Sequence, residues 1–144
     1  MKNGFPVEVL PQCSSVLSVF SAAFLGRNDI EFIHKAGITD CFLVDRDKEK
    51  LEGMKTLFGY GFHCGDAFEF VRNHKKKYDL VITDQWSSMD SYTWDNRELF
   101  LNLATKYLIM GICYEQKKYN QVPEGEFFHR SDNFGGVFWH LTKL

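Results

Sequence analysis

The sequence predicts a single α/β domain with a doubly wound, mostly parallel sheet and an antiparallel hairpin at its C-terminal end. Two observations lead to this prediction. Short apolar runs without helical periodicity alternate along the chain with segments in which apolar residues recur at helical spacing, the pattern of parallel strands joined by right-handed helical crossovers. The last two strand-like runs have no helix between them, which is typical of a hairpin.

The apolar pattern places the elements in order. We expect strands at 16–21, 41–44, 61–66, 80–83 and 108–115, helices at 28–35, 47–59, 68–77 and 95–107, and hairpin strands at 126–131 and 135–144. In the helix at 47–59 the predicted buried stripe consists of Leu51, Met54, Leu57 and Phe58. The basic residues at 74–77 suit the end of a helix, because the helix dipole favours cations there.

Length and charge limit the domain organisation and the partners. A chain of 144 residues is long enough for one domain, so the prediction is a single domain over 1–144. A net charge of −2 gives no overall attraction to nucleic acid or to an anionic membrane. The apolar stretch at 16–26 follows Pro11 and Gln12 rather than the basic segment of a signal peptide, so we expect a cytoplasmic protein without a membrane span.

Cysteine and histidine show no spacing typical of metal ligands. Cys13, Cys41, Cys64 and Cys113 form no C-x-x-C pair and lie mostly in apolar runs, which predicts reduced, buried thiols rather than a metal centre or a disulfide framework. The 5 histidines lack ligand spacing such as H-x-x-x-H. We therefore predict no metal site.

Three acids close predicted parallel strands. Asp45, Asp66 and Asp84 each follow an apolar run, and the carboxyl ends of parallel strands meet at one edge of the sheet. The pattern therefore predicts an acidic rim at the crevice where such sheets bind ligands. A carboxylate after the second strand can accept hydrogen bonds from both hydroxyls of a ribose. The alternative is that these acids only cap the following helices or turns.

The order of motifs resembles the Rossmann-like methyltransferases that use S-adenosylmethionine. The motifs are "VLSVFSAAFLG", "CFLVDRD", "FHCGDAFEF", "YDLVITDQW" and the closing "GGVFWHL", and together they cover the chain from about residue 14 to its C-terminus. The resemblance implies S-adenosylmethionine as cofactor. It places Asp45 with Arg46 at the cofactor ribose, and Asp66 with Ala67 at the adenine amino group.

The first loop departs from the family pattern hhDhGxGxG. Ser18 stands where the family has an acid, and Phe20 and Phe24 stand in the glycine-rich region. Small residues in this loop let the backbone approach the methionine part of the cofactor. The resemblance therefore implies this role for Ser21, Ala22 and Ala23.

The motif after the fourth strand implies where the reacting group lies. Asp84, Gln85 and Trp86 match the place of [DNS]-P-P-[YFW], in which an acceptor and a backbone carbonyl hold an exocyclic amine while an aromatic ring stacks on the base; both prolines are missing here. Trp86 would stack on a base or cap the edge of the core. We expect Tyr92 and Trp94, in the same aromatic stretch, to form a substrate lid or a partner surface, or else to fold back onto the core.

Other enzymes share part of the pattern. The stretch "GDAFEFVRNHKKKYDLVITD" resembles the polyamine aminopropyltransferases, in which the acid after the fourth strand takes a proton from an attacking amine. Three classes of function remain: a small methyltransferase, an enzyme that catalyses another transfer or cleavage reaction on the same cofactor, and a catalytically inactive member of the fold that binds a partner. We expect the acceptor to be a small molecule or a nucleobase, and the partner to be a second copy of the chain or another protein that supplies recognition.

Overall fold

The computed structural model describes residues 2–21, 29–84, 90–113, 125–129 and 137–144. The strands are β1 (Lys2–Asn3), β2 (Ser15–Val19), β3 (Asp40–Asp45), β4 (Gly61–Cys64), β5 (Tyr78–Thr83), β6 (Ala104–Cys113), β7 (Glu126–His129) and β8 (Val137–Lys143). The α-helices are α1 (Asp29–Lys35), α2 (Lys48–Phe58), α3 (Ala67–Asn73), α4 (Asp90–Asp95) and α5 (Arg97–Leu101), and a 3-10 helix, η1, spans Val7–Gln12.

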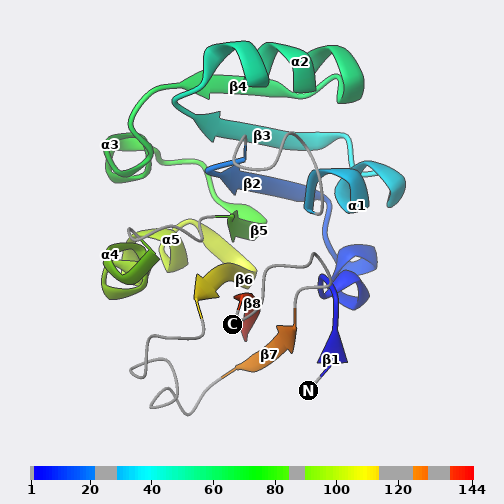
Figure 1. Cartoon of the computed structure of the whole chain (residues 1–144), viewed down its shortest axis with the longest axis vertical. Coiled ribbons are helices and arrows are strands. Elements are labelled where there is room, and N and C mark those ends of the chain that lie inside the picture. The colour runs from blue at the N-terminus through cyan, green and yellow to red at the C-terminus, as the bar shows by residue number, and fades with distance from the viewer. Residues whose placement is uncertain (1, 22–28, 85–89, 114–124, 130–136) are drawn as a thin grey trace.

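The strands form one 8-stranded sheet in the order β1-β7-β8-β6-β5-β2-β3-β4 (Figure 1). β2 pairs in parallel with β3 on one side and with β5 on the other. The chain builds outward from β2 through β3 to β4 and then returns to the other side of β2 with β5. The strand order therefore reverses between the neighbouring strands β2 and β5. Ligands of doubly wound sheets bind at the carboxyl ends of the strands at this point.

The C-terminal strands close the sheet in the antiparallel sense. β8 pairs antiparallel with both β6 and β7, which confirms the predicted hairpin, and its connection at 130–136 lies outside the described residues. β1 then pairs in parallel with β7 and covers that edge of the sheet. The sequence pattern predicted neither β1 nor η1, because both are too short to show a period.

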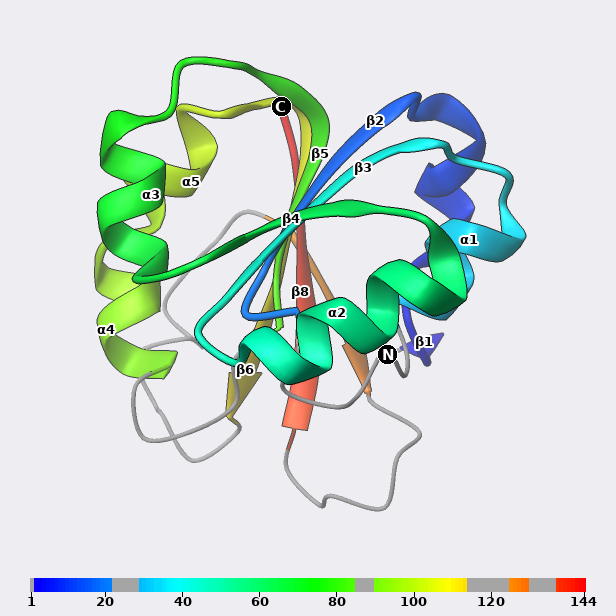
Figure 2. The same ribbon diagram turned by 90° about the horizontal axis from the view of Figure 1, so that it is seen from above.

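Helices cover both faces of the sheet, so the molecule has three layers. In Figure 2, α1, α2 and η1 lie on one face and α3, α4 and α5 on the other. Successive residues of β2 alternate between the two buried layers: Val16 packs with the side chains of α1 and α2, and Leu17 packs with those of α3 and α5. A strand covered on both faces reads as a continuous apolar run, which is why β2 and β5 show no polar alternation.

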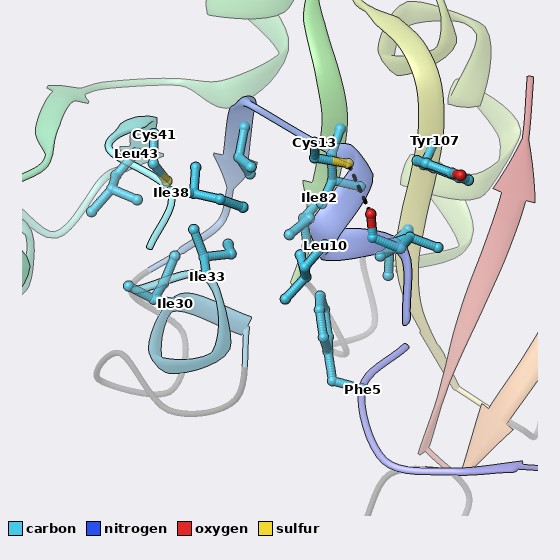
Figure 3. Packing of buried hydrophobic residues seen from close by; sticks show 14 of the residues in the cluster. Phe5, Leu10, Cys13, Ile30, Ile33, Ile38, Cys41, Leu43, Ile82 and Tyr107 are labelled. Atoms are coloured by element: carbon cyan, nitrogen blue, oxygen red, sulfur yellow. Dashed lines mark hydrogen bonds between the residues drawn. The ribbon is translucent and has the colours of Figure 1, made fainter. Parts of the chain in front are cut away.

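The layer beneath α1 and α2 is closely packed. Ile30 and Ile33 project from α1 toward Leu43 of β3 (Figure 3), and all three side chains have no exposed surface. Cys13 also lies in this layer, where its thiol donates a 3.3 Å hydrogen bond to the carbonyl of Val9. This packing buries one face of β2 and β3 beneath α1 and α2.

Caps fix both ends of α2. The Asp47 side chain accepts a hydrogen bond of 3.1 Å from the Lys50 amide, and Gly59 ends the helix with φ +78°, a conformation that glycine adopts without strain. The predicted stripe is confirmed for Leu51 and Met54, which are buried, and wrong for Leu57, which is 69% exposed. Leu57 lies six positions after Leu51 and so falls outside the i, i+3, i+7 row.

The helix predicted over 95–107 is wrong in its second half. α5 ends at Leu101, and β6 already begins at Ala104. The Tyr78 amide donates to the Leu103 carbonyl at 2.8 Å, and Tyr78 pairs with Ala104, so pairing with β5 uses the backbone groups that a helix would need. Leu103 and Ala104 are nevertheless buried, because two adjacent apolar residues fit the start of a strand as well as a helix face.

Candidate functional site

A cavity of about 230 Å³ opens at the carboxyl ends of β2, β3 and β4. Its walls combine aromatic rings, two carboxylates and one guanidinium. The lining residues are Phe20, Asp45, Arg46, Gly65, Asp66, Ala67 and Phe68. Four of the residues predicted to bind a cofactor, Asp45, Arg46, Asp66 and Ala67, are therefore brought together in one cavity wall.

Asp45 is the last residue of β3, and its carboxylate is held by the turn that follows. Oδ1 accepts hydrogen bonds from the amides of Arg46 at 2.7 Å and Asp47 at 3.0 Å. The Asp45 carbonyl also accepts from the Gly65 amide at 2.9 Å, which ties the end of β3 to the loop after β4. These bonds fix the orientation of the carboxylate at the cavity wall.

Asp66 lies between β4 and α3 and has two contacts of different kinds. Oδ1 accepts a 2.9 Å hydrogen bond from the Glu69 amide, so Asp66 is the N-cap of α3 as well as a cavity residue. Oδ2 forms an ion pair with the guanidinium of Arg46. The Glu69 amide, and after it Arg46, hold the pKa of Asp66 below its usual range, so this carboxylate is ionised at neutral pH.

Phe20 stands where the family pattern has glycine, and its backbone still adopts the conformation that favours glycine. Its φ is +61°, a left-handed value that is unusual for a bulky side chain. The Phe20 amide donates to the Val44 carbonyl at 2.8 Å, and the ring packs 5.9 Å from that of Phe68. A non-glycine residue kept in such a conformation is typical of a functional site. The sequence motif indicates that position 20 is unusual, but it does not predict the left-handed backbone conformation of Phe20.

A carboxylate from a helix lies buried beside the first central strand, β2. Ser18 and Asp29 are fully buried, and the Ser18 hydroxyl donates a 2.9 Å hydrogen bond to Asp29 Oδ2. Asp29 is the first residue of α1, so the sequence indicated a helix start there and gave no sign of a buried contact with β2. The pair places a carboxylate beneath the end of β2, near the place where the family has its acid.

The other residues predicted at the first loop divide into two groups. Ser21 is buried, and its hydroxyl donates a 3.4 Å hydrogen bond to the Val44 carbonyl, which links the turn after β2 to β3. Ser21 is not among the residues that line the cavity. Ala22 and Ala23 lie outside the described residues. Their role at the methionine part of a cofactor stays a prediction.

Asp84 follows β5 at the strand reversal. Its side chain is fully buried, and it is not among the residues that line the cavity. Thr83, the last residue of β5, is also fully buried, and its hydroxyl has no hydrogen-bond partner within the described part of the chain. Gln85 and Trp86 lie outside the described residues, so the predicted catalytic group is represented here by Asp84 alone.

The aromatic residues of α4 have separate roles. Trp94 is buried, and its ring centroid lies 5.0 Å from that of His140 in an edge-to-face arrangement, so it belongs to the core and is not a lid. Tyr92 is 45% exposed and packs edge-on against Phe68, whose ring lines the cavity. α4 therefore supports the cavity wall from outside.

The cysteines differ in their burial. Cys13 and Cys41 are buried as predicted, whereas Cys64 is exposed, contrary to the prediction. Cys64 ends the short edge strand β4, and the Cys64 thiol donates to the Arg46 carbonyl at 3.3 Å. Only one side of an edge strand is paired, so an apolar strand pattern does not guarantee burial.

No group of three or more His, Cys, Asp or Glu side chains is arranged to hold a metal ion within the described ranges of the chain. None of the helices the structure describes combines the length and the apolar character needed to cross a bilayer.

Compared by sequence, the chain matches no protein-family model and no curated protein. Solved structures are similar. An rRNA methylase from Streptococcus thermophilus aligns with a TM-score of 0.65 at 12% identity, covering 96% of this chain and 93% of its own. Human methyltransferase-like protein 13, in complex with S-adenosylhomocysteine, aligns with a TM-score of 0.64 at 13% identity, covering 97% of this chain and 76% of its own.

A third similar structure is a porphyrin methyltransferase. Magnesium protoporphyrin IX methyltransferase from Synechocystis, with bound S-adenosylmethionine, aligns with a TM-score of 0.61 at 15% identity over 95% of this chain and 75% of its own. The chain has the fold of the Rossmann-like methyltransferases. This methyltransferase fold confirms the predicted fold class, and its cavity lies at the carboxyl ends of the strands, as expected for such sheets.

Proposed function

We propose that the chain binds S-adenosylmethionine in the cavity at the carboxyl ends of β2, β3 and β4, and that it is a small methyltransferase. The observation that carries the proposal is the pair of carboxylates, Asp45 and Asp66, which two successive strand ends bring into one cavity wall. Solved proteins of the same fold bind S-adenosylmethionine or S-adenosylhomocysteine, which supports this choice of ligand.

Asp45 is the residue that we assign to the ribose. Two vicinal hydroxyls are two donors, and one carboxylate accepts both. The Arg46 and Asp47 amides on Oδ1 hold the group in place, so little side-chain freedom is lost on binding. This preorganisation favours affinity.

Asp66 is the residue that we assign to the adenine amino group. An ionised carboxylate accepts hydrogen bonds and donates none, so it favours an amino group over a carbonyl at that position of the base. The rings of Phe20 and Phe68 line the same cavity and give the base an apolar contact. Acid and rings together suit an adenine nucleoside.

S-adenosylmethionine, when bound, supplies an electrophilic methyl group. The chain's own task at that point is to hold the acceptor and remove its proton, and we assign this task to Asp84. Its position supports this assignment, because Asp84 follows β5 at the point where the strand order reverses and ligands of such sheets bind there. Gln85 and Trp86 follow directly and are proposed to complete the acceptor site with an amide and an aromatic face.

Two acceptor classes fit this site: a small molecule and a nucleobase. The solved neighbours include an rRNA methylase and a porphyrin methyltransferase, so both acceptor classes occur on this fold. Transfer of an aminopropyl group to an amine, with Asp84 as base, is the alternative reaction on the same sheet. A chain that binds the cofactor without turnover is the other alternative, and the substitutions at Ser18 and Phe20 favour it.

The experiment is to incubate the protein with cell extract and S-adenosylmethionine that carries an isotopic label on its methyl group. The proposal predicts labelled material that depends on the protein and is lost in the Asp84→Asn variant. Fractionation then assigns the label to small molecules or to nucleic acid. Binding of the cofactor with no labelled acceptor in any fraction would leave two alternatives, the inactive chain and aminopropyl transfer, because the latter does not move the methyl group.

A further inference from the structure

The guanidinium of Arg46 lies on the same carboxylate that we assign to the base. Arg46 Nη2 pairs with Asp66 Oδ2, and both residues line the cavity. The Arg46 side chain is 77% exposed and that of Asp66 37% exposed, so the pair lies at the mouth of the cavity rather than inside it.

The two oxygens of Asp66 are not equivalent. Oδ1 accepts from the Glu69 amide and caps α3, so using it for a ligand would cost helix stability. Oδ2 is therefore the oxygen that a base would use, and Arg46 already donates to it. An adenine amino group is also a donor, so adenine and Arg46 share the lone pairs of one oxygen, and the charge of the guanidinium weakens that oxygen as an acceptor for the base.

For a base with a carbonyl in place of the amino group, the effects of Arg46 and Asp66 are exchanged. The carbonyl oxygen of a 6-oxopurine accepts hydrogen bonds, so Arg46 attracts it and Asp66 repels it. The pair therefore presents a donor and an acceptor to the same edge of the base. If the Asp66 acceptor contributes more to binding, the cavity prefers a 6-aminopurine. If the Arg46 donor contributes more, it prefers a 6-oxopurine.

We propose that Arg46 sets the base preference of the cavity by competing for Asp66 Oδ2, so that it lowers affinity for adenine nucleosides and raises affinity for 6-oxopurine nucleosides. The inference rests on the proposed function, since it assigns the cavity to a nucleoside. An exposed ion pair is weak, so we expect Arg46 to change adenosine affinity by about two- to fivefold.

The test compares the Arg46→Met variant with wild type by calorimetric titration of adenosine and of inosine. Both probes are uncharged, so the overall charge of the protein has little influence on their binding. The matched control is Lys48→Met, which removes one positive charge two positions away; Lys48 pairs with Glu52 and does not line the cavity. Arg46→Met should bind adenosine two- to fivefold more tightly and inosine at least twofold more weakly, and Lys48→Met should bind both as wild type does.

Salt gives a second readout. Salt screens exposed ion pairs, so adenosine affinity should rise between about 0.05 and 0.5 M NaCl in wild type and stay constant in Arg46→Met. Equal or weaker adenosine binding by Arg46→Met would overturn the proposal for Arg46 while leaving the nucleoside site intact. Absence of adenosine binding by all three folded proteins would instead show that the proposed function itself fails, and the inference with it.

Discussion

The backbone amide of Asp84 donates a 3.0 Å hydrogen bond to the carbonyl of Val19. Val19 ends β2, and the residue before Asp84, Thr83, pairs with it across the two central parallel strands. This bond continues the β2–β5 ladder by one residue and places the buried acid at the point where strand order reverses. Asp84 is thus positioned by the central strands themselves, rather than by a surface turn.

Replacing Asp84 by asparagine tests its role in turnover. Asparagine keeps the size and one acceptor oxygen but cannot take a proton, so we expect the rate of group transfer to fall by about 10²-fold or more. Affinity for S-adenosylhomocysteine and the midpoint of urea unfolding should stay close to wild type. Full activity in this variant would exclude the catalytic role, and a joint loss of stability and activity would indicate a structural one.

Phe20 allows a test of backbone strain. At φ +61°, any residue with a Cβ is strained, and glycine is not, so Phe20→Gly should be more stable than Phe20→Ala by about 1 kcal/mol. At most positions the order is the reverse. Both variants lose the contact with the Phe68 ring, so the difference between them isolates the backbone. Urea unfolding measures it, and an alanine variant as stable as the glycine variant would show that the turn relaxes.

Cysteine reactivity reports on the cavity mouth. Burial raises the pKa of Cys13 to about 11, so at pH 8 only about one Cys13 thiol in a thousand is ionised, and burial raises the pKa of Cys41 further. Cys64 is exposed beside Arg46. Iodoacetamide at pH 8 should therefore modify the Cys64 peptide well before those of Cys13 and Cys41, as followed by mass spectrometry.

Ligand should then protect Cys64. S-adenosylhomocysteine in the cavity would cover the Arg46 backbone to which the Cys64 thiol donates, so alkylation of Cys64 should slow at least threefold at saturation. Modification of Cys64 at an unchanged rate, with binding confirmed independently, would place the ligand elsewhere. Reaction of Cys41 as fast as Cys64 would contradict the packing of the α1 layer.

His74 makes stability depend on pH. Its ring stacks 4.4 Å from Phe70, and burial, followed by the charge of Lys76, lowers its pKa in the folded protein. The unfolded chain, with a histidine pKa of about 6.5, binds the proton more readily, so unfolding free energy should fall as pH drops from about 7 to 5. The carboxylates with lowered pKa, Asp66 and Asp79, lose their contribution only at lower pH, through their usual range near 4 and below.

The variant for this prediction is His74→Gln, which cannot titrate. Its urea midpoint should change less between pH 7 and 5 than that of wild type. His63→Gln is the matched control, because His63 also contacts the Phe70 ring but is exposed. An unchanged pH dependence in His74→Gln would assign the effect to another group.

The sequence was sufficient for the parts of the fold that have a clear period. β2, β3 and β5 are buried on both faces and so appear as continuous apolar runs, and α2 shows its stripe in Leu51 and Met54. The boundary between α5 and β6 was missed because Leu103 and Ala104 suit either element, and only pairing with Tyr78 decides between them. Tertiary pairing of this kind leaves no local signal.

The site was predictable where it depends on strand ends. Asp45 and Asp66 follow apolar runs, and parallel pairing brings them to one edge. The ion pair between Arg46 and Asp66 and the buried contact between Ser18 and Asp29 join residues on different elements, so no spacing indicates them. Asp66 also showed that the two roles weighed from sequence, cap and cavity residue, can be filled by one side chain.

Calorimetric titration of S-adenosylhomocysteine into the wild-type protein and the Asp45→Asn variant tests the central claim most directly. Asparagine at position 45 keeps an acceptor oxygen for the Arg46 and Asp47 amides but loses the charge that would hold the ribose. The matched control is Asp47→Asn, which removes a neighbouring charge and keeps an acceptor for the α2 cap. We predict one ligand per chain, an affinity weakened by about 1.5 to 3 kcal/mol in Asp45→Asn, and no comparable loss in Asp47→Asn. No binding to the folded wild-type protein at millimolar ligand would contradict the account.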